Sequence, residues 1–184
     1  HPDTATSLNN LGQLLSDKGD VDEAEPFFRR SLEINEKVLG VEHPDTATSL
    51  NNLALLLHNK GDYDGAEPLF RRSLEIREKV LDPDDPEIAD TLYCMAIGIL
   101  LSEKEDFDQA EPLLRRSLEI RKKVLDPDDP EIAETLYYLA LLLKNKGNVD
   151  EAEPLLCRSL EIREKVLGLE HPDTATSLNN LGQL

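Results

Sequence analysis

The chain has no tryptophan, only two cysteines (Cys94 and Cys157), and an aromatic content of 4% over its 184 residues. Two cysteines are too few for a disulfide framework. We expect both thiols to be unpaired in a reducing compartment, which favours a cytoplasmic location. With so few aromatic side chains, any core must be built mainly from leucine and alanine.

Long apolar runs and positive charge are also scarce. The sequence contains no stretch of about 18 apolar residues and no charged-then-apolar leader. It has 20 Lys and Arg against 38 Asp and Glu, a formal net charge of −18. This charge disfavours nucleic acid and anionic membranes as partners. Two interpretations of the acid remain open: it keeps an extended surface in solution, or it selects neutral or basic peptides.

The chain does have a strong internal repeat. The segment AEPLFRRSLEI, which begins at Ala66, recurs with few changes from Ala24, Ala110 and Ala152, at spacings of 42, 44 and 42 residues. Each copy continues to a Lys-Val-Leu ending. Self-similarity at a fixed period of this size is typical of solenoid proteins.

We therefore predict one all-α domain over residues 1–184, an α-solenoid of stacked helical repeats. Residues 171–184 restart the motif and are identical to residues 1–14. The sequence begins without methionine and stops inside a motif, so we expect it to be part of a longer array. The predicted repeats are 1–42, 43–84, 85–128 with a two-residue insertion, 129–170, and a terminal half repeat, 171–184.

The second repeat shows the expected helix pair. A first helix should begin at His43 or Asp45, with Pro44 at its first position, and should end at Gly61. Asp62 should cap the second helix. Its predicted apolar face comprises Ala66, Leu69, Phe70, Leu74 and Ile76, and continues to Val80 and Leu81.

Two features of the predicted helices leave alternatives open. Pro68 lies beyond the first turn, so we expect either a slight kink or a helix that begins only near Glu67. In the third repeat, Glu105 replaces the turn glycine, and the two added residues should be absorbed near residues 101–105. They would form a longer turn or a π-bulge beside Gly98.

The second repeat resembles a tetratricopeptide repeat (TPR). Matches to the consensus are Leu53, Ala54, Leu57, Gly61, Tyr63, Ala66, Phe70, Ser73 and Leu74. Leu50 replaces the consensus tryptophan, the closing proline is absent, and the second helix continues for about two more turns. This form is similar to the 42-residue repeats of kinesin light chains and of bacterial signalling proteins.

The resemblance implies that antiparallel helix pairs form a right-handed superhelix, in which the first helix of each repeat lines a concave binding groove. The corresponding inward residues are Asn9, Asn10, Asn51, Asn52, Tyr93, Cys94, Tyr137, Tyr138, Asn179 and Asn180. Asparagines can hold a peptide backbone, and tyrosines add flat apolar contacts. Alternatively, the asparagines tie adjacent helices together and the tyrosines fill the groove. Basic residues, which carboxylate-clamp and kinesin-type grooves use, are absent from these positions.

Nothing in the sequence indicates catalysis. His1, His43 and His171 recur in His-Pro-Asp motifs, which suggests a helix-start role rather than a metal site, since no ligand pair has metal-binding spacing. No catalytic triad or phosphate-binding loop is evident, so we predict no enzyme, no cofactor and no metal.

The predicted function is a protein–protein interaction scaffold that binds an extended peptide in the concave groove. The alternative is a sensor or spacer segment of a larger signalling ATPase. The repetition of residues 1–14 at 171–184 also predicts end-to-end self-association through the terminal helices; otherwise the last helix is a solubilising cap.

Overall fold

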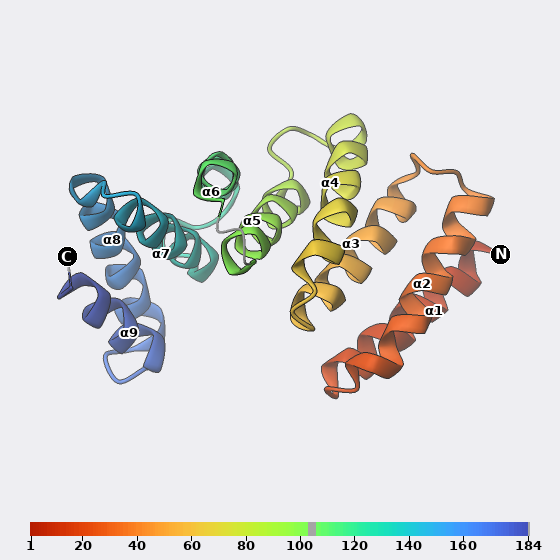
Figure 1. The fold of residues 1–184 in the computed structure, drawn as a ribbon, viewed down its shortest axis with the longest axis horizontal. Coiled ribbons are helices and arrows are strands. Elements are labelled where there is room, and N and C mark those ends of the chain that lie inside the picture. The colour runs from red at the N-terminus through yellow and green to blue at the C-terminus, as the bar shows by residue number, and fades with distance from the viewer. Residues whose placement is uncertain (103–105, 184) are drawn as a thin grey trace. The chain divides into compact units, whose positions relative to one another are not determined.

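The computed structural model describes residues 1–102 and 106–183. These residues form nine α-helices and no strand (Figure 1). All-α architecture is therefore confirmed for the described part of the chain. The helices are α1 (Pro2–Asp17), α2 (Val21–Val38), α3 (Pro44–Asn59), α4 (Tyr63–Val80), α5 (Pro86–Leu101), α6 (Phe107–Val124), α7 (Pro130–Asn145), α8 (Val149–Leu167) and α9 (Pro172–Leu181).

The helices pack in two compact units, and the boundary between the units passes through α5. The first unit contains residues 1–83 and the described residues from Gly98 to Ser102; the second contains residues 84–97 and 106–183. In the first unit, α1 packs on α2, α3 on α4, and α2 on α3. In the second, α7 packs on α6 and α8, and α8 on α9. Each unit is thus a stack of helix pairs, while the exact repeat boundaries remain a prediction.

The recurring His-Pro and Asp-Pro motifs start the first helices. Proline occupies the first turn, and the preceding residue accepts a hydrogen bond from the backbone N–H two positions on. His43 Nδ1 accepts from Asp45 at 3.1 Å, and Asp129 Oδ1 accepts from Glu131 at 2.8 Å. His171 caps α9 in the same way. The predicted helix-start role is therefore confirmed for His43 and His171, and Asp129 performs the same task. His1 precedes Pro2 at the start of α1 but is the exception, because its side chain accepts no cap hydrogen bond.

The turn between α3 and α4 follows from its sequence. Gly61 has φ +81°, the Asp62 N–H bonds to the Leu57 carbonyl, and the Gly61 N–H bonds to the His58 carbonyl, which closes α3 with a Schellman motif. Asp62 Oδ1 then accepts from the Gly65 N–H at 2.9 Å. Because this cap supports the first turn, α4 begins at Tyr63, and the alternative start near Glu67 is wrong. Pro68 lies inside the helix.

The two added residues of the third repeat lie between helices. Helix α5 has 16 residues, the same as α3, and the Ser102 N–H still bonds to the Gly98 carbonyl four residues earlier. Helix α6 begins only at Phe107, and the π-bulge beside Gly98 is not formed. The predicted longer turn falls on residues 103–105 and lies outside the described residues. The replacement of the turn glycine at Glu105 lies outside the described residues.

The buried face of the second helices differs from the predicted stripe. Ala66, Phe70 and Ile76 are buried as expected, but Leu69 and Leu74 are half-buried, and Val80 is 47% exposed. Ser73 and Arg77 are buried instead, which moves the stripe around the helix. Ser73 donates to the Ala47 carbonyl of α3 at 2.8 Å. The same bond joins the equivalent pairs Ser31 and Ala5, Ser117 and Ala89, and Ser159 and Ala133.

Candidate functional site

Three of the predicted groove residues form one aromatic cluster in the second unit. The Tyr93 ring of α5 meets the Tyr138 ring of α7 with centroids 6.0 Å apart and planes at 67°. Tyr137 and Tyr138 lie at 5.3 Å and 82°. Both contacts have the edge-to-face geometry that aromatic pairs prefer. All three side chains are half-buried, so each keeps a surface that another molecule can reach.

Helix α9 extends this cluster with an asparagine. Asn180 Nδ2 donates to the Tyr137 hydroxyl at 2.8 Å. Its sequence neighbour Asn179 is exposed and presents its amide to solvent. The structure therefore brings Tyr93, Tyr137, Tyr138 and Asn180 together from three helices, as the repeat register predicts.

The asparagines of the first unit have divided roles. Asn9 Nδ2 of α1 donates to the Ser49 hydroxyl of α3 at 3.2 Å, so Asn9 ties adjacent helices together, as one of the two interpretations held. Asn10 is exposed, and Asn51 and Asn52 are half-buried. Cys94, which lies beside Tyr93 in the sequence, forms no disulfide with Cys157.

Two arginines that the sequence analysis did not assign to the site lie against the tyrosines. The Arg121 guanidinium carbon is 4.8 Å from the Tyr93 ring centroid, and that of Arg163 is 4.5 Å from the Tyr137 centroid. Both are cation–π contacts. The first helices lack basic residues at the inward positions, but the second helices supply guanidinium groups there. The sequence signal for this feature is the recurrence of arginine three residues before the valine of the Lys-Val-Leu ending.

These arginines also join successive repeats. Arg121 Nη1 donates to the Glu131 carbonyl at 3.1 Å and to the Thr135 hydroxyl at 2.7 Å. Arg163 Nη1 donates to the Asp173 carbonyl at 3.2 Å and to the Ser177 hydroxyl at 2.7 Å. Each guanidinium thus holds the start of the next first helix while its face covers a tyrosine. Charged hydrogen bonds of this kind fix the orientation of the aromatic cluster.

The surroundings of Tyr93 and Tyr138 disfavour ionisation of their hydroxyls. Burial raises the pKa of Tyr93 above its ordinary value, and the charge of Glu134 raises it further. Burial and the charge of Glu134 also raise the pKa of Tyr138. The Tyr93 hydroxyl is hydrogen-bonded to Glu134, whereas the protonated Tyr138 hydroxyl can donate a hydrogen bond to a peptide carbonyl.

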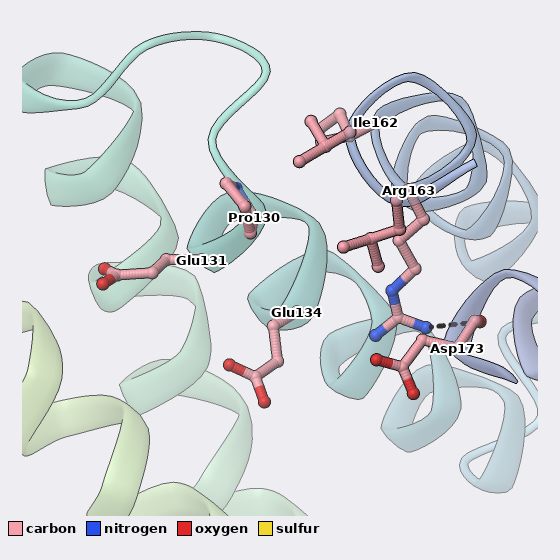
Figure 2. Close-up of a pocket in the computed structure, with 8 residues that line it drawn as sticks. Pro130, Glu131, Glu134, Ile162, Arg163 and Asp173 are labelled. Atoms are coloured by element: carbon pink, nitrogen blue, oxygen red, sulfur yellow. Dashed lines mark hydrogen bonds between the residues drawn. The ribbon is translucent and has the colours of Figure 1, made fainter. Parts of the chain in front are cut away.

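A pocket of about 250 Å³ opens beside this cluster, also within the second unit (Figure 2). It lies between the starts of α7 and α9 and the end of α8. Its lining residues are Pro130, Glu131, Glu134, Ile162, Arg163, Val166, Leu167 and Asp173. In the described part of the chain, no three His, Cys, Asp or Glu residues are grouped closely enough to hold a metal ion.

The fold and this site define the class of the protein. Stacked helix pairs whose first helices present asparagine and tyrosine side chains are characteristic of an α-solenoid built from helical repeats. The tetratricopeptide repeat family model matches residues 3–79, 49–123, 87–165 and 131–184. The chain therefore belongs to the tetratricopeptide repeat family.

Solved structures show the same relationship. A putative kinesin light chain from Podosopora anserina, with nearly identical TPR-like repeats, has a TM-score of 0.81 and 26% sequence identity. That match covers 100% of this chain and 86% of the other. BtubC (BKLC) from P. vanneervenii has a TM-score of 0.81 and 24% identity over 94% of this chain and 68% of its own. These neighbours are kinesin-light-chain-like repeat proteins, which confirms the predicted fold class.

The fold is also shared by a more distantly related structure. The MamA RS-1 ArsTM double mutant shares only the fold, with a TM-score of 0.67 and 15% identity over 88% of this chain and 76% of its own. No curated protein matches the sequence. Within residues 1–102 and 106–183, none of the helices combines the length and the apolar character needed to cross a membrane.

Proposed function

We infer that the chain is a non-enzymatic interaction scaffold that binds an extended peptide segment of a partner protein. Membership of the tetratricopeptide repeat family supports a protein partner. The observation that carries the finer proposal is the cluster of Tyr93, Tyr137 and Tyr138 with Asn180, held by two arginines. Rigid aromatic side chains with polar tips contribute contact area to a peptide at low conformational cost.

The remaining site residues complete this proposal. Asn10 and Asn52 in the first unit, and Asn179 in the second, can donate to and accept from a peptide backbone without reading its sequence. Their sequence neighbours Asn9, Asn51 and Asn180 complete the proposed set of groove residues. The net charge of −18 favours a neutral or basic segment. We propose no catalytic residue and no cofactor, and a cytoplasmic location remains part of the proposal.

Peptide selection tests this function. Peptides selected from a random library on the immobilised intact chain should lose about tenfold or more in affinity on Tyr138→Ala, because truncating an aromatic anchor is costly. Asn52→Ala should lose less. Isothermal titration calorimetry gives the affinities, and Asn145→Ala, at an exposed position near the end of α7, is the control. Unchanged affinity for every selected peptide in both test variants would refute the groove proposal.

A second partner that we propose is another copy of the chain. A methyl group built on Gly12 would lie 3.0 Å from Cζ of Phe28. Only glycine at this position therefore lets α1 pack on its binding surface on α2 without displacing the Phe28 ring. Gly182 occupies the equivalent position in the identical segment 171–184. That segment can therefore occupy the α1-binding surface of α2 in a second molecule. The contact is heterologous, so it forms open chains.

Light scattering over a wide range of protein concentration tests this association. The intact chain should increase in mean mass with concentration, and the increase should disappear when residues 171–184 are removed. A mass that stays monomeric for the intact chain throughout the range contradicts the association.

A further inference from the structure

The pocket beside the tyrosine cluster has two chemically different walls. One wall is apolar and consists of Pro130, Ile162, Val166 and Leu167, with Val166 46% and Leu167 39% exposed. The other carries the carboxylates of Glu131, Glu134 and Asp173, and Arg163 is the one basic residue among the lining residues. The Glu131 carboxylate is already paired with Arg121, whose Nε lies 3.5 Å from Glu131 Oε2, so Glu134 and Asp173 carry the negative charge available to a ligand. The pocket thus combines apolar surface with an excess of negative charge, which suits a long side chain that ends in a cation.

The preceding repeat shows what the carboxylate at this position does when a cation is present. Asp90 stands at the position equivalent to Glu134, and Arg121 at that equivalent to Arg163. Arg121 Nη2 lies 2.8 Å from Asp90 Oδ1, so that the chain's own guanidinium neutralises the carboxylate while covering Tyr93. The Arg121 side chain is 5% exposed, so its guanidinium is largely covered while it pairs with Asp90.

At the pocket the same pairing is not made. The Arg163 guanidinium hydrogen bonds instead to the Asp173 carbonyl and the Ser177 hydroxyl. Figure 2 shows the Glu134 carboxylate turned away from that guanidinium, and both residues line the pocket. Among the residues that the structure describes, the Glu134 carboxylate has no ion pair like that of its counterpart Asp90, and it is hydrogen-bonded to the Tyr93 side chain.

We propose that this pocket binds the cationic side chain, lysine or arginine, of the partner peptide. The proposal rests on the proposed function and adds the chemistry of one contact to it. The aliphatic stem packs on Val166, Leu167 and Pro130, and the charged head pairs with Glu134 and Asp173.

Nuclear magnetic resonance titration of the intact 184-residue chain tests the pocket with small probes. The probes are Nα-acetyl-lysine amide and Nα-acetyl-arginine amide, and the uncharged comparison is Nα-acetyl-norleucine amide. We expect saturable shifts at Glu134, Val166 and Asp173 with the cationic probes, with a Kd on the order of millimolar. Norleucine amide should bind at least about threefold more weakly, because it keeps the stem and loses the charge.

Matched variants assign the contact. Glu134→Gln should weaken the cationic probes about fivefold and leave norleucine amide unchanged. Glu119→Gln, at an exposed position of α6, removes the same charge elsewhere and should leave all three probes unchanged. Amide spectra of both variants show whether the fold is retained. If Glu134→Gln does not fold, the ratio of lysine-amide to norleucine-amide affinity in the native chain still decides the result.

Three outcomes would overturn the proposal. They are equal binding of norleucine amide, equal weakening by both variants, and no saturable shift at the pocket residues. None of them bears on the tyrosine cluster. Selected peptides that depend on Tyr138 but bind equally when their lysines and arginines are replaced by norleucine would leave the proposed function standing and reject this contact.

Discussion

Phe70→Ala is expected to lower the free energy of unfolding by about 3–5 kcal/mol, among the largest effects of a core truncation. The Phe70 side chain is 1% exposed and is among the largest fully buried side chains of the chain. Truncation removes its apolar surface from the core and leaves a cavity that the rigid helix backbones fill only partly. Urea denaturation followed by far-ultraviolet circular dichroism measures the change.

Val80→Ala provides the matched control for this measurement. Val80 lies on the same helix and belongs to the repeated Lys-Val-Leu ending, yet it is 47% exposed. Its truncation should change the free energy of unfolding by no more than about 0.5 kcal/mol. If Val80→Ala cost as much as Phe70→Ala, the face of α4 that packs on α3 would be assigned incorrectly.

Arg121→Met should lower the free energy of unfolding by about 2–4 kcal/mol. The substitution keeps the length and apolar stem of the side chain but removes its hydrogen bonds to Asp90, the Glu131 carbonyl and Thr135. Arg121 is buried, whereas the Asp90 side chain is 51% exposed, so the carboxylate left behind is partly solvated and the cost stays below that of a fully buried pair.

Lys122→Met is the control for Arg121→Met, since it removes one positive charge from the adjacent, exposed position. It should change the free energy of unfolding by less than about 0.5 kcal/mol. Because Arg121 joins the third repeat to the fourth, hydrogen exchange should show the loss of protection concentrated in α6 and α7. A uniform loss of protection, or equal effects of the two variants, would contradict this junction role.

The junction arginines connect stability with the candidate site. The same guanidinium groups that bind the next repeat also cover Tyr93 and Tyr137. A variant that loosens the junction should therefore also disorder the aromatic surface. For this reason Tyr138→Ala tests binding more cleanly than any substitution of Arg121, since no arginine covers Tyr138 among the cation–π contacts of the described residues.

Much of this protein is determined by the sequence alone. The period of the repeated segment establishes the solenoid class, and the helix ends follow from single residues: Pro44 after a capping His43, Gly61 with its positive φ, and Asp62 as the next cap. These features can be predicted from the sequence because they depend on local backbone geometry, which each residue restricts within its own turn. The placement of Tyr137 and Asn180 on neighbouring first helices follows from the same period.

Only the tertiary structure decided which helix faces are buried and which charges meet. Val80 is exposed while Ser73 and Arg77 are buried, because a second helix packs on a different arc from the one that its apolar residues suggest. Arg121 bonds to a carbonyl ten residues on and to a carboxylate of an earlier helix, and Arg163 leaves Glu134 unneutralised. Such contacts depend on how three helices cross, and the distances between residues remote in sequence are set by that packing rather than by any local pattern.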